Sequence, residues 1–214
     1  MSNQTQHTFH SYICQSSTMR IFLILLLLSG IQSSFAQAPK YSNEFLSIGV
    51  GARGLAMSKA QVASVNDITS AYWNPAGLTG ISDNLQVAGQ HAEYFAGIAK
   101  YDYLAGGTKI DDRSAVAFSM VRFGVDDIPN TTQLIDQNGQ VNYDRITTFS
   151  AADYAFLMSY AKKIGEKGLS LGGNAKVIYR QVGQMARAWG FGIDVGAQYQ
   201  FGKWKVGAVG RDIT

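Results

Sequence analysis

Three short motifs contain residue types that could carry chemistry. GVGARG (Gly49–Gly54) has the glycine spacing of a dinucleotide-binding turn, in which the backbone approaches a pyrophosphate. GLSLG (Gly168–Gly172) has the spacing of a nucleophile elbow, which exposes a reactive serine. DQNG (Asp136–Gly139) resembles the start of a calcium-binding loop. Each motif can carry out its chemistry only when particular helices or strands surround it, so the neighbouring elements determine whether the motif is functional.

The surroundings of these motifs favour none of the three chemistries. A dinucleotide fold needs a crossover helix and a second parallel strand, whereas Asn74-Pro75 and a series of alternating segments follow the glycines. The serine lies inside an alternating segment, and the acidic loop lacks its later glutamate, so Asn138-Gly139 predicts a hairpin turn. His91 could pair with a serine on a neighbouring strand, but a structural or lumen-facing histidine is the simpler interpretation. We predict no catalytic residue, no cofactor and no metal site, and hence no enzyme.

The N-terminus has the pattern of a secretory signal peptide. After Met19-Arg20 comes IFLILLLLSGI, an apolar core of about ten residues that is too short to span a bilayer comfortably. Small residues at Ser34 and Ala36 predict cleavage after Ala36, so residues 1–36 form a leader. The polar stretch Met1–Thr18 is unusual ahead of a signal peptide, so the start of translation is either Met1 or Met19.

Composition narrows the possible partners of the exported chain. Cys14, the single cysteine, lies in the leader, so the mature chain has neither a disulfide nor a thiolate metal site. The sequence has 18 basic and 15 acidic residues, interspersed along the chain. Because no basic cluster forms a surface for a polyanion, nucleic acid is not an expected partner.

From Leu85 onward, the residues alternate between two faces. In residues 169–180, leucine, valine and tyrosine oppose serine, asparagine, lysine and arginine, and residues 188–199 repeat the pattern. Strands of about ten residues exceed the five or six usual in soluble sheets and match membrane-crossing strands. We therefore expect about seven antiparallel strands within residues 83–214. The expected strands are 85–93, 99–105, 114–124, 153–160, 169–180, 188–199 and 204–211.

The two faces predict a transmembrane β-barrel. The aromatic face is expected to contact lipid, and the face with glycine and charge to line a lumen. The residues assigned to the lumen by this rule are Lys100, Asp102, Lys176, Arg180 and Asp194. An exported β-sandwich remains the soluble alternative, since the same alternation would allow it.

The connections are short on one side and long on the other, as in outer-membrane barrels. Thr108–Arg113, Ile164–Gly168 and Gly202–Lys203 are the short turns, whereas Val125–Phe149 is long, polar and expected to be extracellular. This long loop is the candidate partner site, with a loop folded over its own barrel mouth as the equal alternative. Its apolar residues are Ile128, Pro129, Leu134, Ile135 and Tyr143.

Residues 37–82 neither alternate nor repeat. Asp67 is expected to cap a short helix that ends near Trp73, because the residue before a proline avoids the helical conformation. In a barrel, such a segment is most simply a plug, and its glycines would let the backbone pass close to the wall. The candidate plug residues are Gly49, Gly51, Gly54, Trp73, Asn74, Pro75 and Gly77.

Several stretches resemble a known family. NEFLSIGVGARGLAM and AQVASVNDITSAYWNPAGL resemble the N-terminal signature of the PorV/PorQ family, within the FadL-like outer-membrane barrels. HAEYFAGIAKYDY, RFGVDDIPNTTQLID and YDRITTFSAADYAF are similar to its PorV-like branch. The resemblance implies an all-β antiparallel transmembrane barrel of about fourteen strands with an N-terminal plug. It also implies location in the bacterial outer membrane.

The resemblance leaves two functions open. PorV-like members belong to the type IX secretion system, so outer-membrane lipid, the translocon and cargo proteins with C-terminal sorting domains are the implied partners. FadL-like members instead take up hydrophobic small molecules through the barrel. With about seven strands, this chain is expected to be the N-terminal half of a longer barrel, because open edges in lipid leave backbone groups unsatisfied.

Overall fold

The computed structural model describes residues 41–136, 138–166 and 168–213. The predicted leader (residues 1–36) and the first four residues of the predicted plug (37–40) lie outside the described residues. Within the described part, no helix is both long enough and apolar enough to cross a membrane.

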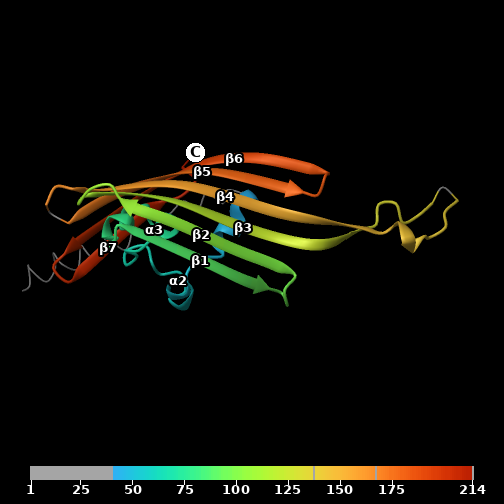
Figure 1. The fold of residues 1–214 in the computed structure, drawn as a ribbon, viewed down its shortest axis with the longest axis horizontal. Coiled ribbons are helices and arrows are strands. Elements are labelled where there is room, and N and C mark those ends of the chain that lie inside the picture. Colours follow the sequence, from blue (N-terminus) through green and yellow to red (C-terminus); the bar gives the residue numbers. More distant parts are fainter. Residues whose placement is uncertain (1–40, 137, 167, 214) are drawn as a thin grey trace, which may run out of the picture. The chain divides into compact units, whose positions relative to one another are not determined.

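Seven antiparallel strands form one sheet in sequence order (Figure 1), which confirms the predicted number of strands and their antiparallel arrangement. The register is continuous from each strand to the next, apart from one bulge in β3. The strands are β1 (Leu85–Tyr94), β2 (Ala99–Lys109), β3 (Ser114–Asn130), β4 (Thr147–Ile164), β5 (Leu169–Val182), β6 (Ala186–Phe201) and β7 (Trp204–Gly210).

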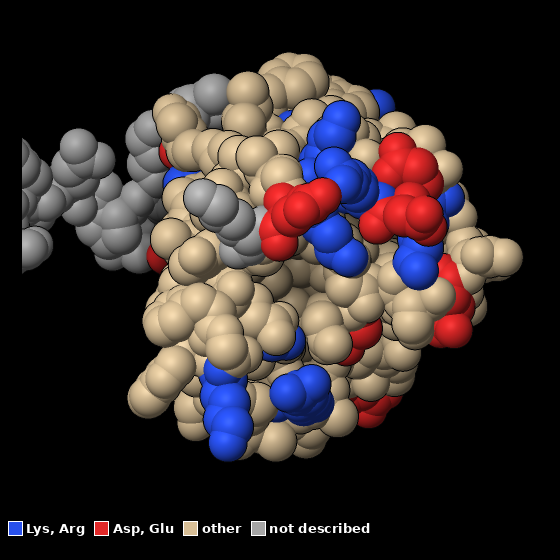
Figure 2. Space-filling model, turned by 90° about the vertical axis from the view of Figure 1, so that its left-hand side faces the viewer, with Lys and Arg blue, Asp and Glu red and all other residues tan. Residues whose placement is uncertain are grey.

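The short hairpins β2–β3, β4–β5 and β6–β7 all lie at one end of the sheet, as antiparallel order requires. Figure 2 shows this end, where basic and acidic side chains gather around a hollow. The β3–β4 connection leaves the opposite end (Figure 1).

Residues 43–82, which we call the inner segment, pack against the concave face of the sheet. The segment contains α2 (Ala52–Ala56), α3 (Ser70–Trp73), η2 (Pro75–Gly80) and all but the first two residues of η1 (Tyr41–Ser47). The core forms where the segment meets the strands, and its fully buried side chains include Val50, Val65, Leu78, Ile81, Tyr101 and Val121.

The predicted helix is shorter than expected, although its end is correct. α3 ends at Trp73, ahead of Pro75. Its N-cap is Thr69, so the prediction of Asp67 as the cap was wrong by two residues. Asp67 instead stabilises the turn before the helix, because its Oδ1 accepts the backbone N–H of Thr69 at 2.8 Å.

The predicted faces are confirmed for β5 and β6. Asn174, Lys176 and Asp194 are buried against the inner segment, whereas Trp189 and Phe191 are exposed on the convex face. The polar residues of these strands therefore point inward, and the aromatic residues point outward.

On β2 the two faces are reversed, and the assignment of Lys100 and Asp102 to the lumen was wrong. Tyr101 and Tyr103 are buried instead, and the ring of Tyr103 lies 6.3 Å from that of Tyr72 on α3. Residues 100 and 102 must then point outward, since successive side chains alternate. The inner segment presents aromatic rings to β2, so the tyrosines gain more from facing inward than the charged residues would.

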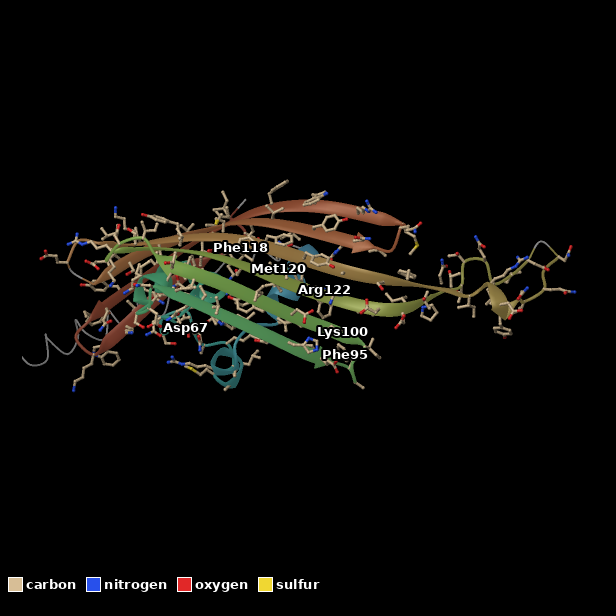
Figure 3. All side chains as sticks on the ribbon, viewed as in Figure 1. Asp67, Phe95, Lys100, Phe118, Met120 and Arg122 are labelled. Carbon is tan, nitrogen blue, oxygen red and sulfur yellow. The ribbon has the colours of Figure 1, made fainter. Side chains whose placement is uncertain are left out.

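The outward charges of β1–β3 form a cluster beside apolar side chains. Asp102 contacts His91 Nδ1 at 2.6 Å and Arg122 at 3.1 Å, and Lys100 contacts Asp126 at 2.9 Å. His91 therefore faces outward, contrary to the lumen-facing interpretation. Figure 3 shows Phe118, Met120 and Arg122 in succession along the sheet, with Lys100 farther toward the same end.

The long connection is shorter than predicted because both flanking strands continue beyond the sheet. β3 extends to Asn130 and β4 begins at Thr147, so Ile128 and Pro129 belong to a strand rather than to the loop. A bulge between Val125 and Ile128 interrupts the register. Asp126 and Asp127 lie in this bulge, where Asp127 has a φ of 57°.

Candidate functional site

Asn74 joins the inner segment to the wall of the sheet. The chain is extended at this residue (φ −160°), between the end of α3 and the start of η2. The Oδ1 atom accepts the N–H of Ala76 at 3.1 Å and thereby caps η2. The Nδ2 atom donates to the carbonyl of Val62 at 2.8 Å and to that of Ala197 on β6 at 3.1 Å. One buried amide therefore holds two parts of the inner segment and a strand together.

Glycines on the inner face of the wall make room for this contact. A Cβ atom at Gly196 would lie 2.0 Å from Asn74 Oδ1, and one at Gly172 would lie 2.5 Å from the backbone of Pro75. We did not predict these two wall residues. The available signal was that both glycines occupy inward positions of alternating strands, where a close backbone approach requires the absence of a side chain.

Two glycines of the inner segment, Gly49 and Gly54, serve a different purpose from the one predicted. A Cβ at Gly54 would lie 2.7 Å from the Trp73 ring, and one at Gly49 would lie 3.1 Å from it. These two glycines accommodate the indole within the segment, rather than a close passage along the wall. Gly51 does reach the wall, because its N–H donates to Gln90 Oε1 of β1 at 2.6 Å.

Trp73 and Tyr72 fasten the glycine turn to α3. Trp73 Nε1 donates to the carbonyl of Val50 at 3.0 Å, and the Tyr72 hydroxyl accepts the N–H of Gly49 at 2.9 Å while donating to the carbonyl of Leu46. Burial raises the pKa of the Tyr72 hydroxyl, which therefore remains protonated as a donor.

Gly77, the last motif residue, packs against Val65, whose carbonyl oxygen would lie 2.5 Å from an added Cβ. Gly49 and Gly54 are thus brought together around the Tyr72–Trp73 pair, whereas Gly77 packs elsewhere in the segment.

A buried ion pair lies beside this motif. Lys176 Nζ contacts Asp194 Oδ1 at 2.7 Å, with the two side chains only 3% and 6% exposed. Asp212 adds a second carboxylate at 2.6 Å from the same ammonium group. Asn174 donates to Asp194 Oδ2 at 3.2 Å and to the carbonyl of Ala71 in α3 at 2.9 Å. The network therefore connects β5 and β6 to the inner segment.

The predicted partner loop ends in a small hairpin. Ile135 pairs with Val141 in an isolated bridge, and Asp136 accepts the N–H of Gly139 at 3.1 Å. The predicted turn at Asn138-Gly139 lies at this tip, where Gly139 has a φ of 77°. Ile135 and Tyr143 are 65% and 72% exposed, whereas Leu134 is half-buried. Figure 1 shows the loop reaching beyond the strand ends, in line with β3 and β4.

The other two motifs form no reactive centre in the described part of the chain. Ser170 lies within β5, and its hydroxyl is hydrogen-bonded to Thr79 Oγ1 at 2.8 Å. Asp136 Oδ1 accepts two backbone N–H groups of the hairpin tip, from Asn138 and Gln140, each at 2.9 Å. Both side chains therefore have structural contacts.

The long antiparallel strands, the apolar and aromatic convex face of β5 and β6 and the inner segment define the wall of a β-barrel with a plug-like core. A family model described as "Type IX secretion system protein PorV" matches residues 37–207, which is most of the chain. The chain therefore belongs to the PorV family of type IX secretion system proteins. No curated protein matches the sequence.

Proposed function

We propose that this protein acts in the outer membrane as a component of type IX secretion that engages cargo carrying C-terminal sorting domains. The observation that carries the proposal is the projecting β3–β4 loop (residues 131–146). Its exposed apolar residues stand among polar ones, and apolar anchors within a polar rim are typical of protein interfaces.

Three parts of the chain have distinct roles in this proposal. Residues 1–36 direct export and are removed after Ala36. Residues 37–82 form the plug, and residues 83–214 contribute the strands that cross the membrane. The convex face supports membrane insertion, because Phe118, Phe191 and Ile193 are exposed there and such a surface suits hydrocarbon rather than water.

Uptake of hydrophobic compounds is the competing function. It requires an apolar binding pocket beside the plug, whereas the Lys176–Asp194 pair and Asn174 occupy the inner face of β5 and β6. Apolar and aromatic side chains of β2 and β3 that face inward are already packed against the inner segment. These contacts favour secretion over uptake.

Deletion of the gene distinguishes the two functions. Under the secretion proposal, proteins with C-terminal sorting domains accumulate in the periplasm, while growth on hydrophobic substrates is unchanged. A normal secretome combined with impaired growth on those substrates would support uptake instead.

Crosslinking tests the loop directly. The single native cysteine, Cys14, lies in the predicted leader, so a Leu134→Cys variant carries one addressable thiol after export. We expect a thiol-reactive crosslinker at this position to capture a sorting-domain protein or a translocon subunit. Lys203→Cys, in the β6–β7 turn at the opposite end, is the matched control. Equal capture of the same proteins by both variants would argue against a role specific to the loop.

A further inference from the structure

A hollow of about 1060 Å³ opens at the end of the sheet with the short hairpins, between the inner segment and the inner face of the wall. Figure 2 looks onto this end and shows basic side chains on more than one side of the hollow. Asn66 and Thr79 of the inner segment and Gln198 and Gln200 of β6 contribute polar groups to the lining. We call this hollow the basic mouth, because three cationic residues also line it.

The cationic residues are Arg113, Lys163 and Lys205. Lys163 pairs in register with Ser170, which faces the inner segment through its bond to Thr79. Lys205 pairs with Gln200 and therefore shares the inner face of the sheet. Both lysines thus belong to the inner face of the wall.

Arg113 lies next to Lys163, since its carbonyl accepts the Lys163 N–H at 2.8 Å. Glu166 is the single acidic residue in the lining. The three cations therefore leave the basic mouth with a positive charge.

These cations have no acidic partner among the described residues. The ion pairs of that part of the chain involve His91, Lys100, Arg122, Lys176 and Arg180. Asp111, two residues before Arg113, accepts the backbone N–H of Arg113 at 2.7 Å. Lys100, Arg122, Lys176 and Arg180 on the wall each meet a carboxylate, whereas the three cations that line this cavity do not.

The spacing of the cations indicates the shape of the ligand. Lys163 and Lys205 are on β4 and β7, three strand intervals apart, which corresponds to about 14 Å along the sheet. An extended chain with several carboxylates can place a separate carboxylate at each lysine. The amide side chains of Gln198 and Gln200 lie between the two lysines, although Gln198 already donates to the carbonyls of Val62 and Val65.

We propose that the basic mouth binds an acidic, extended segment of a partner protein. The short turns of outer-membrane barrels face the periplasm, so the partner would approach from that side. This orientation rests on the proposed function, whereas binding itself depends only on the cavity and its charges.

Two double variants with the same charge change test the proposal. The test variant is Lys163→Gln with Lys205→Gln, and the control is Lys162→Gln with Lys203→Gln, whose residues neighbour the first pair but do not line the cavity. The probe is a fluorescent peptide of alternating glutamate and glycine, titrated into the protein in lipid nanodiscs. We expect the Kd to rise about 2- to 30-fold in the test variant, from the loss of two ion pairs. The control should stay within about twofold of the wild type, since its lysines make no such pairs.

Further measurements separate the outcomes. Glu166→Gln should tighten binding of the peptide, because it removes the one negative charge of the lining. Equal weakening in both double variants would overturn the proposal, as would unchanged binding in the test variant. Pyrophosphate is the competing small anion; if it binds as tightly as the peptide and depends on the same lysines, the site serves small anions and the peptide proposal is wrong. None of these results depends on secretion, so they leave the loop proposal to its own test.

Discussion

β2 and β5 show the same alternation of residue types but use their faces in opposite ways. β5 turns Asn174 and Lys176 toward the inner segment, whereas β2 turns Tyr101 and Tyr103 toward it. The difference follows from what the inner segment presents. Opposite β2 lies the Tyr72 ring, and opposite β5 lies the backbone carbonyl of Ala71.

The alternation of residue types along a strand defines two faces, but it does not determine which face points inward. A charged residue is stable inside when it meets a buried partner, as Lys176 meets Asp194. A charged residue is also stable outside when neighbouring strands supply its counter-charge, as Asp126 does for Lys100.

The largest expected effect is on the buried pair. In a solvated lumen, Lys176→Ala would change little. Because Asp194 would instead be left buried without its counter-charge, we expect the free energy of unfolding to fall by about 3–5 kcal/mol. Urea titration in lipid vesicles measures this, with Lys100→Ala on β2 as the control. An equal fall in the free energy of unfolding for Lys176→Ala and Lys100→Ala would contradict the prediction that only Lys176 is buried beside its counter-charge.

The second prediction concerns the convex faces of both strands. Ile193→Arg on β6 and Leu104→Arg on β2 should each destabilise the inserted protein by about 2–4 kcal/mol, since both side chains are exposed where lipid is expected. Quenching by brominated lipid of a tryptophan placed at 193 or 104, compared with 194 or 103, reports the faces independently. Stronger quenching at 103 than at 104 would contradict the reversal on β2.

The third prediction concerns the close approach of the wall to Asn74. Gly196→Ala should cost about 1–3 kcal/mol and loosen the inner segment, because overpacking forces a rigid contact apart. Gly106→Ala on β2 is the matched control, since its Cβ would lie 3.7 Å from the nearest atom, Val87 Cγ1. Protease cleavage within residues 57–66 measures the loosening, and equal cleavage of the two variants would count against the contact.

The smallest effect is expected for the aromatic contact of β2. Tyr103→Leu removes the edge-to-face contact with Tyr72, whose planes meet at 76°, and such a pair contributes about 0.5–1.5 kcal/mol beyond its buried area. A double-mutant cycle with Tyr72→Leu isolates the contact. A coupling energy near zero would show that the rings do not stabilise each other.

Local patterns predicted much of the fold. The two-residue period located all seven strands, and Pro75 correctly placed the end of α3 at Trp73. Short turns at Gly165 and Gly202, and the hairpin tip at Gly139, have the positive φ angles that favour glycine. These features depend on residues close together in the chain, so a single sequence reveals them.

Contacts between distant residues were harder to predict. Asn74 packs against Gly196, which is more than a hundred positions away in the sequence. The inward orientation of the β2 tyrosines depends on their contact with Tyr72. The glycine spacing at Gly49–Gly54 proved to be shaped by the Trp73 ring. In each case the residue that determines the contact belongs to another element. The periodicity of one strand or helix carries no information about such a contact.

The bulge at Asp126-Asp127 also determines where the partner loop points. An extra residue on one strand bends it and increases the local right-handed twist. Beyond the bulge, β3 and β4 continue as a two-stranded ribbon without neighbours (Figure 1), and such ribbons twist more than strands within a sheet. A small change at Asp127 would therefore swing the whole loop tip sideways, so this position sets the direction from which a partner can approach.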